Sequence, residues 1–390
     1  MKRQFCNASS KMHYCFYVLI CGGVMETKGR IKSFDAFRGL IILLVVSYGH
    51  YWQFTPAGYY ADGTNVFFTE VTNKVTQFSF SYTYSMMEFL FLLSGFQMFK
   101  YFELIRDNNL GFFDFMKKRF KRLYPLYFIS TIVMAIGLLI YPSIAGAPWY
   151  DRRAEGYHVI MNLLCIQTWS SDKSTINGPL WFVSVLVFCL ILFYVISRLA
   201  SKVKDGLWLM GIPVVIGILF TTSGLPWPLL NSSMCRGYIA FFLGVLVASF
   251  AYKIKRKNAN IYSCTAIVLY ILYQIFGKAL IYEETPLLSR SLPALFMVYI
   301  PLILLVVRNP FLDKIIGNKV FCSLGLISYA LYTLNFPFYV WLEIYNLFAG
   351  ADLPYGKTPM YWIMPAVQIG LAVLIYFFVE KPISKWLQKV

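Results

Sequence analysis

The sequence predicts an all-α polytopic membrane protein with about ten transmembrane helices. Of its 390 residues, 58% are hydrophobic and only 14% are charged, whereas soluble domains carry about 25% charged residues. The apolar residues form blocks of about twenty, which is the length that a helix needs to cross a bilayer. Runs such as IILLVV and FCLILFYVI lack the polar–apolar alternation of a membrane β-barrel.

Ten apolar blocks are long enough to be read as membrane crossings. The predicted spans are Ala36–Phe54, Phe80–Phe102, Leu123–Tyr141, Leu180–Leu199, Leu207–Thr222, Cys235–Tyr252, Tyr262–Phe276, Leu292–Val307, Leu326–Phe348 and Met360–Val379. The apolar stretch Tyr157–Trp169 is too short to cross, so we expect a re-entrant or interfacial helix there.

The distribution of basic residues supports this layout. With the N-terminus inside, all but eight of the 35 Lys and Arg fall in segments predicted to be cytoplasmic, as the positive-inside rule requires. The eight assigned to the outer side are Lys74, Arg152, Arg153, Lys173, Arg236, Lys278, Arg290 and Lys357. Both termini are therefore expected in the cytoplasm, with the chain in the plasma (inner) membrane. The net charge of +17 indicates an anionic membrane surface rather than nucleic acid, because no nucleic-acid-binding motif is visible.

Residues 1–33 are predicted to form a cytoplasmic N-terminal extension, and residues 34–390 a single membrane domain. The eight Cys are scattered without a CxxC pair, so we expect neither a metal site nor a disulfide framework, and no permanently bound cofactor. The outer loop Thr55–Ser79 is polar with interleaved aromatic residues. Aromatic faces stack on sugars, but interfacial anchoring is the favoured reading.

The first span carries three unexpected polar residues, Asp35, Arg38 and His50, in FDAFRGLIILLVVSYGHYW. A neutral imidazole carries protons near pH 7 and is a suitable base for a sugar hydroxyl. The alternative is a hydrogen bond between helices, which is the more common role of a lone membrane histidine. Asp35 and Arg38 are suited to an interfacial ion pair.

Other polar groups accompany later spans. Glu88 lies within SMMEFLFLLSGF, where a charged side chain costs about 2.5–3.5 kcal/mol and must face protein or water. Arg119 and Arg122 in KKRFKRLYP share a helical face; they are suited to a phosphate clamp or to a simple stop-transfer cluster. Trp181 in NGPLWFVSVLVF marks the entry of a span.

Together, and in this order, these motifs resemble the integral-membrane acyltransferase-3 family. FDAFRG is similar to the family's opening Leu-Asp-Gly-Leu-Arg-Gly, and FLFLLSGF, RFKRLYP, GPLWF, ISYALYTLNFPF and FVEKPISKW follow, so that the likeness spans residues 34 to 386. The resemblance implies an enzyme that moves an acyl group, commonly acetyl, from cytoplasmic acyl-CoA to a hydroxyl of a cell-surface or lipid-linked glycan. Its expected partners are the acyl-CoA donor, the glycan acceptor and membrane lipids.

The resemblance also implies roles for single residues. The implied catalytic residues are His50 and Glu88, the acyl-CoA-binding residues Arg38, Arg119 and Arg122, and the supporting residues Asp35, Ser94, Trp181 and Asn335. We expect His50 to act as the general base on the acceptor hydroxyl, with Glu88 as an orienting partner.

Three positions depart from the family's pattern. Leu186 stands where the family frequently has Glu, and Asn335 stands where it has His. His50 lies twelve residues after Arg38 instead of eleven; eleven α-helical steps bring two side chains to within roughly 20° of each other, whereas twelve separate them by roughly 120°. A single π-bulge absorbs one extra residue, so we expect one near Ser47 and Gly49.

Two other function classes stay open. A proton-coupled transporter or flippase for a glycan or lipid-linked sugar would also need intramembrane Glu and His side chains. The Arg-x-x-Arg pair and the lack of a visible repeated half favour the enzyme. A membrane scaffold would leave Glu88 without an explanation.

Overall fold

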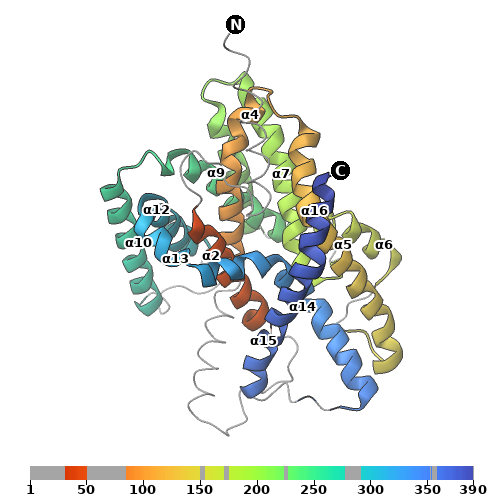
Figure 1. Cartoon of the computed structure of the whole chain (residues 1–390). Coiled ribbons are helices and arrows are strands. Elements are labelled where there is room, and N and C mark those ends of the chain that lie inside the picture. The colour runs from red at the N-terminus through yellow and green to blue at the C-terminus, as the bar shows by residue number, and fades with distance from the viewer. Residues whose placement is uncertain are drawn as a thin grey trace.

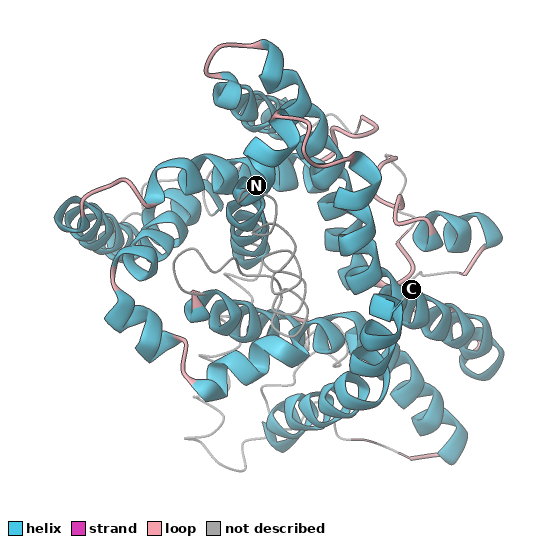
Figure 2. Ribbon diagram, turned by 45° about the horizontal axis from the view of Figure 1, so that its top comes forward, coloured by secondary structure: helices cyan, strands magenta, loops and turns pink. Residues whose placement is uncertain are grey.

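The computed structural model describes residues 31–50, 85–149, 154–170, 175–223, 227–276, 291–351, 353 and 358–389. Within these ranges the chain is helical and contains no β-strand, as its hydropathy predicts (Figures 1 and 2). The elements before residue 200 are α2 (Lys32–Ile42), the π-helix η1 (Leu43–Gly49), a helix over 85–98, η3 (Phe99–Tyr101), α4 (Phe102–Arg106), α5 (Phe112–Ala145), α6 (Gly156–Leu163), η4 (Gly178–Leu180) and α7 (Trp181–Leu199).

The remaining elements complete the helical fold. They are η5 (Ala200–Lys202), η6 (Gly206–Met210), α8 (Gly211–Ser223), α9 (Ser232–Ala251), α10 (Arg256–Phe276), α11 (Leu292–Ala294), η9 (Leu295–Tyr299), α12 (Ile300–Arg308), α13 (Pro310–Ile316), α14 (Lys319–Ala349), α15 (Thr358–Ile375), η10 (Tyr376–Glu380) and α16 (Lys381–Lys389).

Helices occupy the described part of each of the ten predicted spans, but ten membrane crossings are not confirmed. Among the described residues, five helical segments are long and apolar enough to cross a membrane, and a bent pair, Leu292–Arg308 with Pro310–Ile316, is a sixth if it counts as one span. The five are Phe112–Ala145, Gly178–Lys202, Ser232–Ala251, Lys319–Ala349 and Pro359–Leu387. The predicted loop Thr55–Ser79 and most of the predicted extension 1–33 lie outside the described residues.

The short apolar stretch after residue 156 does not form a span. Its helix α6 has only eight residues, Gly156–Leu163, about 12 Å of helix axis. The prediction of a short helix over this stretch is confirmed, while its place at the membrane interface stays a prediction.

The long helix α14 organises one half of the molecule, because α2, α5 and α15 all pack against it. Gly39 of α2 and Gly325 of α14 face each other's helices so closely that a Cβ on either would collide with the opposite backbone. In the other half α9 is enclosed by α7, α8 and α12. The most apolar stretch of α9 is 78% buried, whereas the most apolar stretch of Pro359–Leu387 is only 22% buried.

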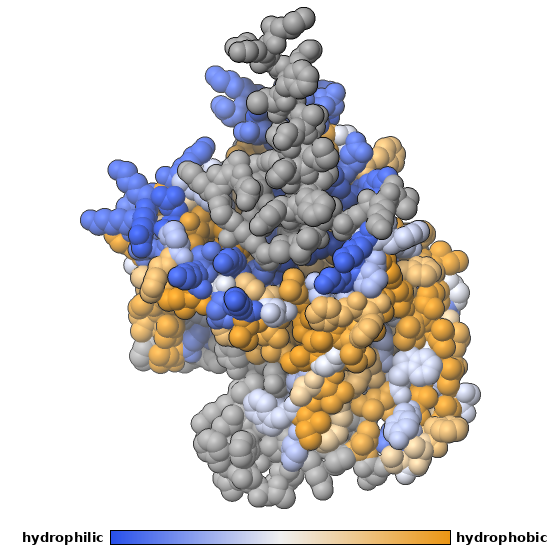
Figure 3. Space-filling model, viewed as in Figure 1, coloured by the Kyte–Doolittle hydropathy of each residue, from blue (hydrophilic) through white to orange (hydrophobic). Residues whose placement is uncertain are grey.

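The segments predicted to be cytoplasmic meet at one end of the molecule. Lys121 donates to the Leu387 carbonyl oxygen (2.7 Å) and Arg198 to that of Ile105 (3.2 Å). The Ser33 backbone amide donates to the Asp313 carboxylate (2.8 Å). Figure 3 shows hydrophilic residues gathered on the upper part of this face, above an apolar band. The segments therefore share one end, and its cytoplasmic orientation stays a prediction.

The expected π-bulge in the first helix is confirmed. The regular helix α2 passes into a π-helix over Leu43–Gly49 that ends next to His50. Since a π-turn contains an extra residue, the twelve-residue spacing from Arg38 to His50 is accommodated within one continuous helix.

We predict that removing the extra residue is tolerated, whereas adding another is not. Deletion of Leu44 should convert η1 into regular α-helix and keep the His50 position next to Asn335, since eleven α-helical steps preserve the face. Insertion of one alanine after Leu44 should turn that position away by about 100°. Cysteines replacing His50 and Asn335 test this in membranes, through the disulfide-linked peptide detected by mass spectrometry. Cross-linking of the insertion variant as efficient as that of the deletion variant would contradict the prediction.

Candidate active site

The first helix holds its polar residues at its two ends. Arg38 forms an ion pair with Asp35 three residues before it, with 3.2 Å between Nη1 and Oδ1. This is the pair that the sequence suggested. His50 lies at the other end, directly after the π-helix.

His50 contacts Asn335 of α14, with 3.1 Å between Nδ1 and Oδ1. The Asn335 amide nitrogen donates to the carbonyl oxygen of Val46 (3.2 Å) and approaches Oε1 of Gln368 (3.5 Å). Because both of these groups are acceptors, the amide nitrogen must face them, and its oxygen must face the imidazole. His50 therefore donates through Nδ1, and the lone pair of the neutral ring lies on Nε2.

The position of Asn335 depends on two irregular helices. Val46 belongs to the π-helix, where the ordinary i→i+4 pairing of carbonyl oxygens is interrupted. In α14, Pro337 has no N–H to give to the Thr333 carbonyl, and the buried side chain of Asn177 donates to that oxygen instead (2.9 Å). Asparagine side chains thus satisfy backbone oxygens at both places.

Phe336 links the histidine to the GPLW motif. Its ring makes an edge-to-face contact with His50, with 5.5 Å between centroids. The same ring lies against Gly178 at the start of η4, where any Cβ would collide with it. Gly178 of the Asn-Gly-Pro sequence therefore leaves room for the Phe336 ring, on the side of that ring away from His50.

Glu88 is paired with an arginine and not with His50. Its side chain is fully buried, and Arg236 of α9 donates to both carboxylate oxygens, at 2.6 and 3.2 Å. Ser291 donates a third hydrogen bond (3.1 Å), and the Arg236 guanidinium lies over the ring of Trp181, 4.9 Å from its centroid. The predicted residues Glu88 and Trp181 thus meet at one site, and between the described residues no hydrogen bond joins Glu88 to His50.

The assignment of Arg236 to an outer loop was wrong, because it lies within α9 and is 7% exposed. The sequence indicates that an arginine at the head of an apolar run needs an acid and that the intramembrane Glu88 needs a base, but it does not show that the two are partners.

A second cationic site lies near the hydrophilic end of α5. The guanidinium of Arg119 lies over the rings of Phe115 and Tyr101, at 3.6 and 4.6 Å from their centroids, and Nη2 is 3.2 Å from the Met98 sulfur. Nη1 donates to the Phe115 carbonyl oxygen. Among the described residues no carboxylate pairs with Arg119, and its buried Nε has no hydrogen-bond partner.

Two neighbouring residues were not predicted. Arg119 and Arg122 both lie close enough to Lys100 for their positive charges to repel its ammonium group. Arg122 is exposed, and its charge acts on Glu380, one of whose oxygens is buried with no hydrogen-bond partner among the described residues. Glu380 belongs to the FVEKP motif, and Lys100 follows FLFLLSGF closely. The predicted arginine pair is therefore part of a larger charged cluster.

Ser94 and Leu186 take no part in these networks. The Ser94 hydroxyl donates to the Leu90 carbonyl oxygen of its own helix (2.8 Å). Leu186 is half-buried in α7, against the apolar core.

The comparison with family models decides the assignment. A model described as an acyltransferase domain, of the acyltransferase-3 type, matches residues 31–379, which is nearly the whole described chain. The chain belongs to the acyltransferase-3 family. No curated protein and no solved structure matches it. The resemblance predicted from the ordered motifs is therefore confirmed, and the protein is a membrane acyltransferase with several apolar helices.

We predict that the acyltransferase depends on the Glu88–Arg236 pair for stability. Glu88→Gln leaves the buried guanidinium without its counter-charge, and breaking such a pair costs about 3–5 kcal/mol. Glu88→Gln combined with Arg236→Met removes both charges and should recover most of the loss. Thermal unfolding of the purified variants in detergent measures this. If the single variant melts at the wild-type temperature, the pair does not hold these helices together.

Proposed function

We propose that this acyltransferase moves an acyl group, acetyl in the simplest case, from cytoplasmic acyl-CoA to a hydroxyl of a cell-surface or lipid-linked glycan. The hydrogen bonding of His50 carries the proposal. Asn335 holds the ring with Nδ1 as donor, so that Nε2 is the basic nitrogen. Family membership supports acyl transfer in general, and the donor and acceptor are our inference from the two sites.

On the acceptor side His50 acts as a general base. Nε2 takes the proton of the acceptor hydroxyl as its oxygen attacks the thioester carbonyl, and the C–S bond breaks as the C–O bond forms. The coenzyme leaves as a thiolate, which takes up the proton that His50 accepted and so returns the imidazole to its neutral form. In this scheme Asn335 is the positioning residue of the base. Glu88, whose oxygens bond to Arg236 and Ser291, anchors the helices instead of orienting His50.

On the donor side the cationic cluster provides the phosphate site. A cation withdrawn from water is costly unless an anion accompanies it, and Arg119 lacks a carboxylate partner among the described residues. Phosphates of coenzyme A would supply that anion, and guanidinium groups bind phosphate with paired hydrogen bonds. Arg122 and Lys100 add positive charge nearby. For Arg38, which is already paired with Asp35, we propose a secondary donor-side role.

The transporter alternative receives less support. Proton coupling needs an acid that can release and rebind its proton, whereas both Glu88 oxygens are engaged by Arg236 and one of them also by Ser291, an arrangement suited to holding helices together.

We predict that His50→Ala abolishes detectable transfer while donor binding persists, because loss of a general base costs about 10²–10⁴ in rate. Asn335→Leu removes only the orienting amide and should be milder than His50→Ala. Purified protein, radiolabelled acetyl-CoA and membrane glycolipid provide the assay, with label in the glycolipid as the readout. A His50→Ala enzyme that acylates at the wild-type rate would leave the histidine only a helix-packing role.

We predict that Arg119→Ala and Arg122→Ala each weaken acyl-CoA binding, and that lysine at either position restores it only partly, since it lacks the planar fork. Lys118→Ala is the matched control, because Lys118 is an exposed basic residue of the same helix. Calorimetric titration of the purified variants with acetyl-CoA measures the affinity. Equal binding by all three alanine variants would show that the arginines act only as a topology signal.

A further inference from the structure

Two junctions between helices meet at the end of the molecule that is predicted to be cytoplasmic. One is the tight turn 252–255 between α9 and α10, and the other is the bend at Asn309, where α13 leaves α12 at an angle of 111°. Because α10 packs along α12, the two junctions lie side by side. Figure 1 shows α10, α12 and α13 together on the side of the molecule opposite α5 and α6.

Two arginines connect these junctions crosswise. Arg308, the last residue of α12, donates from Nη1 to the Tyr252 carbonyl oxygen in the turn (3.0 Å). Arg256, the first residue of α10, donates from Nε to Oδ1 of Asn309 at the bend (2.5 Å). Asn309 is 4% exposed, and its amide nitrogen donates to Oδ1 of Asn260 (2.8 Å) and to a carbonyl oxygen of α12 (2.9 Å). The buried amide therefore turns its oxygen to Arg256 and fixes this side chain beside Arg308.

Both guanidinium groups lack a counter-charge. Among the described residues no carboxylate pairs with Arg256 or Arg308, and the buried Nε of Arg308 has no hydrogen-bond partner there. The acid of α13, Asp313, accepts instead from the amide and hydroxyl of Ser33. Three exposed lysines lie close by in the chain: Lys253, Lys255 and Lys257. Since guanidinium groups bind phosphate oxygens with paired hydrogen bonds, two of them without acids are suited to a phosphate group.

Apolar surface beside the two arginines indicates that the phosphate belongs to a lipid. Phe311 and Ile315 of α13 lie one turn apart on one face and are 69% and 51% exposed. On α10, Lys257 begins a stripe of exposed apolar side chains that share its face: Ile261, Val268, Leu272 and Ile275. Figure 3 shows hydrophilic residues on this side of the molecule directly above apolar ones. A soluble phosphate needs no apolar surface, whereas a phospholipid contacts both kinds of surface.

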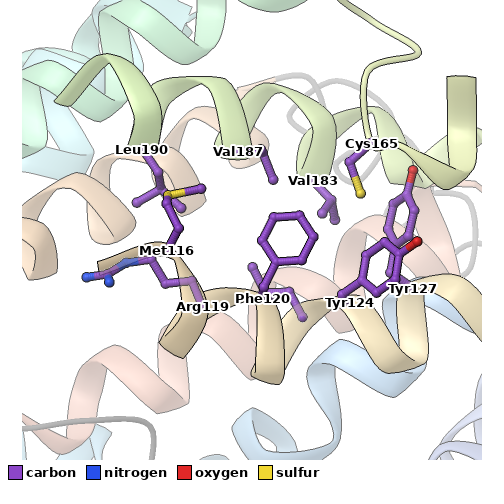
Figure 4. A pocket seen from close by; sticks show the side chains of 10 residues that line it. Met116, Arg119, Phe120, Tyr124, Tyr127, Cys165, Val183, Val187 and Leu190 are labelled. Atoms are coloured by element: carbon purple, nitrogen blue, oxygen red, sulfur yellow. The ribbon is translucent and has the colours of Figure 1, made fainter. Parts of the chain in front are cut away.

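We propose that the two junctions bind one anionic phospholipid, with its phosphate at Arg256 and Arg308 and its acyl chains along the exposed stripe of α10. The positive-inside rule explains basic residues at this end, but it does not explain a buried asparagine that orients one guanidinium beside another. The site is separate from the Arg119 cluster, which Figure 4 shows on α5, facing α7. A lipid bound here joins α10 to α12, and α13 continues the connection to the first helix through Asp313 and Ser33.

Arg256→Gln and Arg308→Gln test the site by removing one charge each. Lys204→Gln is the matched control, because Lys204 is an exposed basic residue at the predicted cytoplasmic end, in the loop after α7. Native mass spectrometry of the purified protein measures the binding of phosphatidylglycerol and of phosphatidylcholine with the same acyl chains. Wild-type protein should bind the anionic lipid at least about tenfold more tightly. Each arginine variant should lose about fivefold of this affinity, the contribution of one basic residue near an anionic lipid, and the control should lose none.

Three outcomes would overturn the proposal. If both arginine variants bind phosphatidylglycerol like wild type, the arginines act only as a topology signal. If glycerol 3-phosphate, which has the phosphate but no acyl chains, displaces the lipid at equal concentration, the site takes free phosphate compounds and not a lipid. If acetyl-CoA displaces the lipid from wild-type protein but not from the arginine variants, these arginines belong to the donor site of the proposed function.

A second measurement covers the case in which the arginine variants fail to fold. Wild-type protein in phosphatidylcholine vesicles is illuminated with a trace of phosphatidylglycerol that carries a diazirine in one acyl chain, and cross-linked peptides are identified by mass spectrometry. Cross-links to α10 or α13 that excess phosphatidylglycerol removes, and additional phosphatidylcholine does not, support the proposal. Cross-links there that both lipids reduce equally show ordinary lipid contact and overturn it, and so does the absence of cross-links to these two helices.

Discussion

A backbone carbonyl buried among packed helices has no water to bond with, and this constraint determines the arrangement around His50. Two helices that meet there, α2 with η1 and α14, are both irregular, so each leaves a carbonyl oxygen for a side chain to satisfy. Asn335 bonds to Val46 and Asn177 bonds to Thr333. The hydrogen bond to Val46 fixes the orientation of the Asn335 amide. Because the amide is fixed, its oxygen selects one tautomer of His50.

Three consecutive residues of α14 therefore have complementary tasks. Asn335 orients the imidazole, Phe336 fills the space between the ring and Gly178, and Pro337 frees the carbonyl that Asn177 binds. Where the family has a histidine, this chain has an amide that cannot exchange protons. The first helix therefore carries the titratable group at this contact, and α14 supplies its geometry.

Much of this could be predicted from the sequence. Hydropathy predicted the helical class and the positions of the helices. The π-bulge was predicted because Arg38 and His50 are twelve residues apart, one more than in the family that the chain resembles. The partner of Glu88 could not be predicted, because Arg236 lies 148 residues away in the chain and local patterns do not reveal which distant charge meets which. The placement of Arg236 in a loop was wrong because a charge count treats every arginine near a span end as a loop residue, and its side of the membrane stays a prediction. Lys100 and Glu380 were not predicted as site residues, because the motifs in or beside which they lie were compared with the family by their order along the chain and not by the charges that they carry.

The Glu88–Arg236 pair also bears on how the chain enters the membrane. Each of these side chains alone would oppose insertion of its helix by about 2.5–3.5 kcal/mol. The carboxylate is synthesised well before α9, so an acceptor for the guanidinium is already at hand when the ribosome delivers Ser232–Ala251. The helix that is most enclosed in the finished protein thus depends on an earlier segment for its entry, and the order of synthesis becomes part of the folding information.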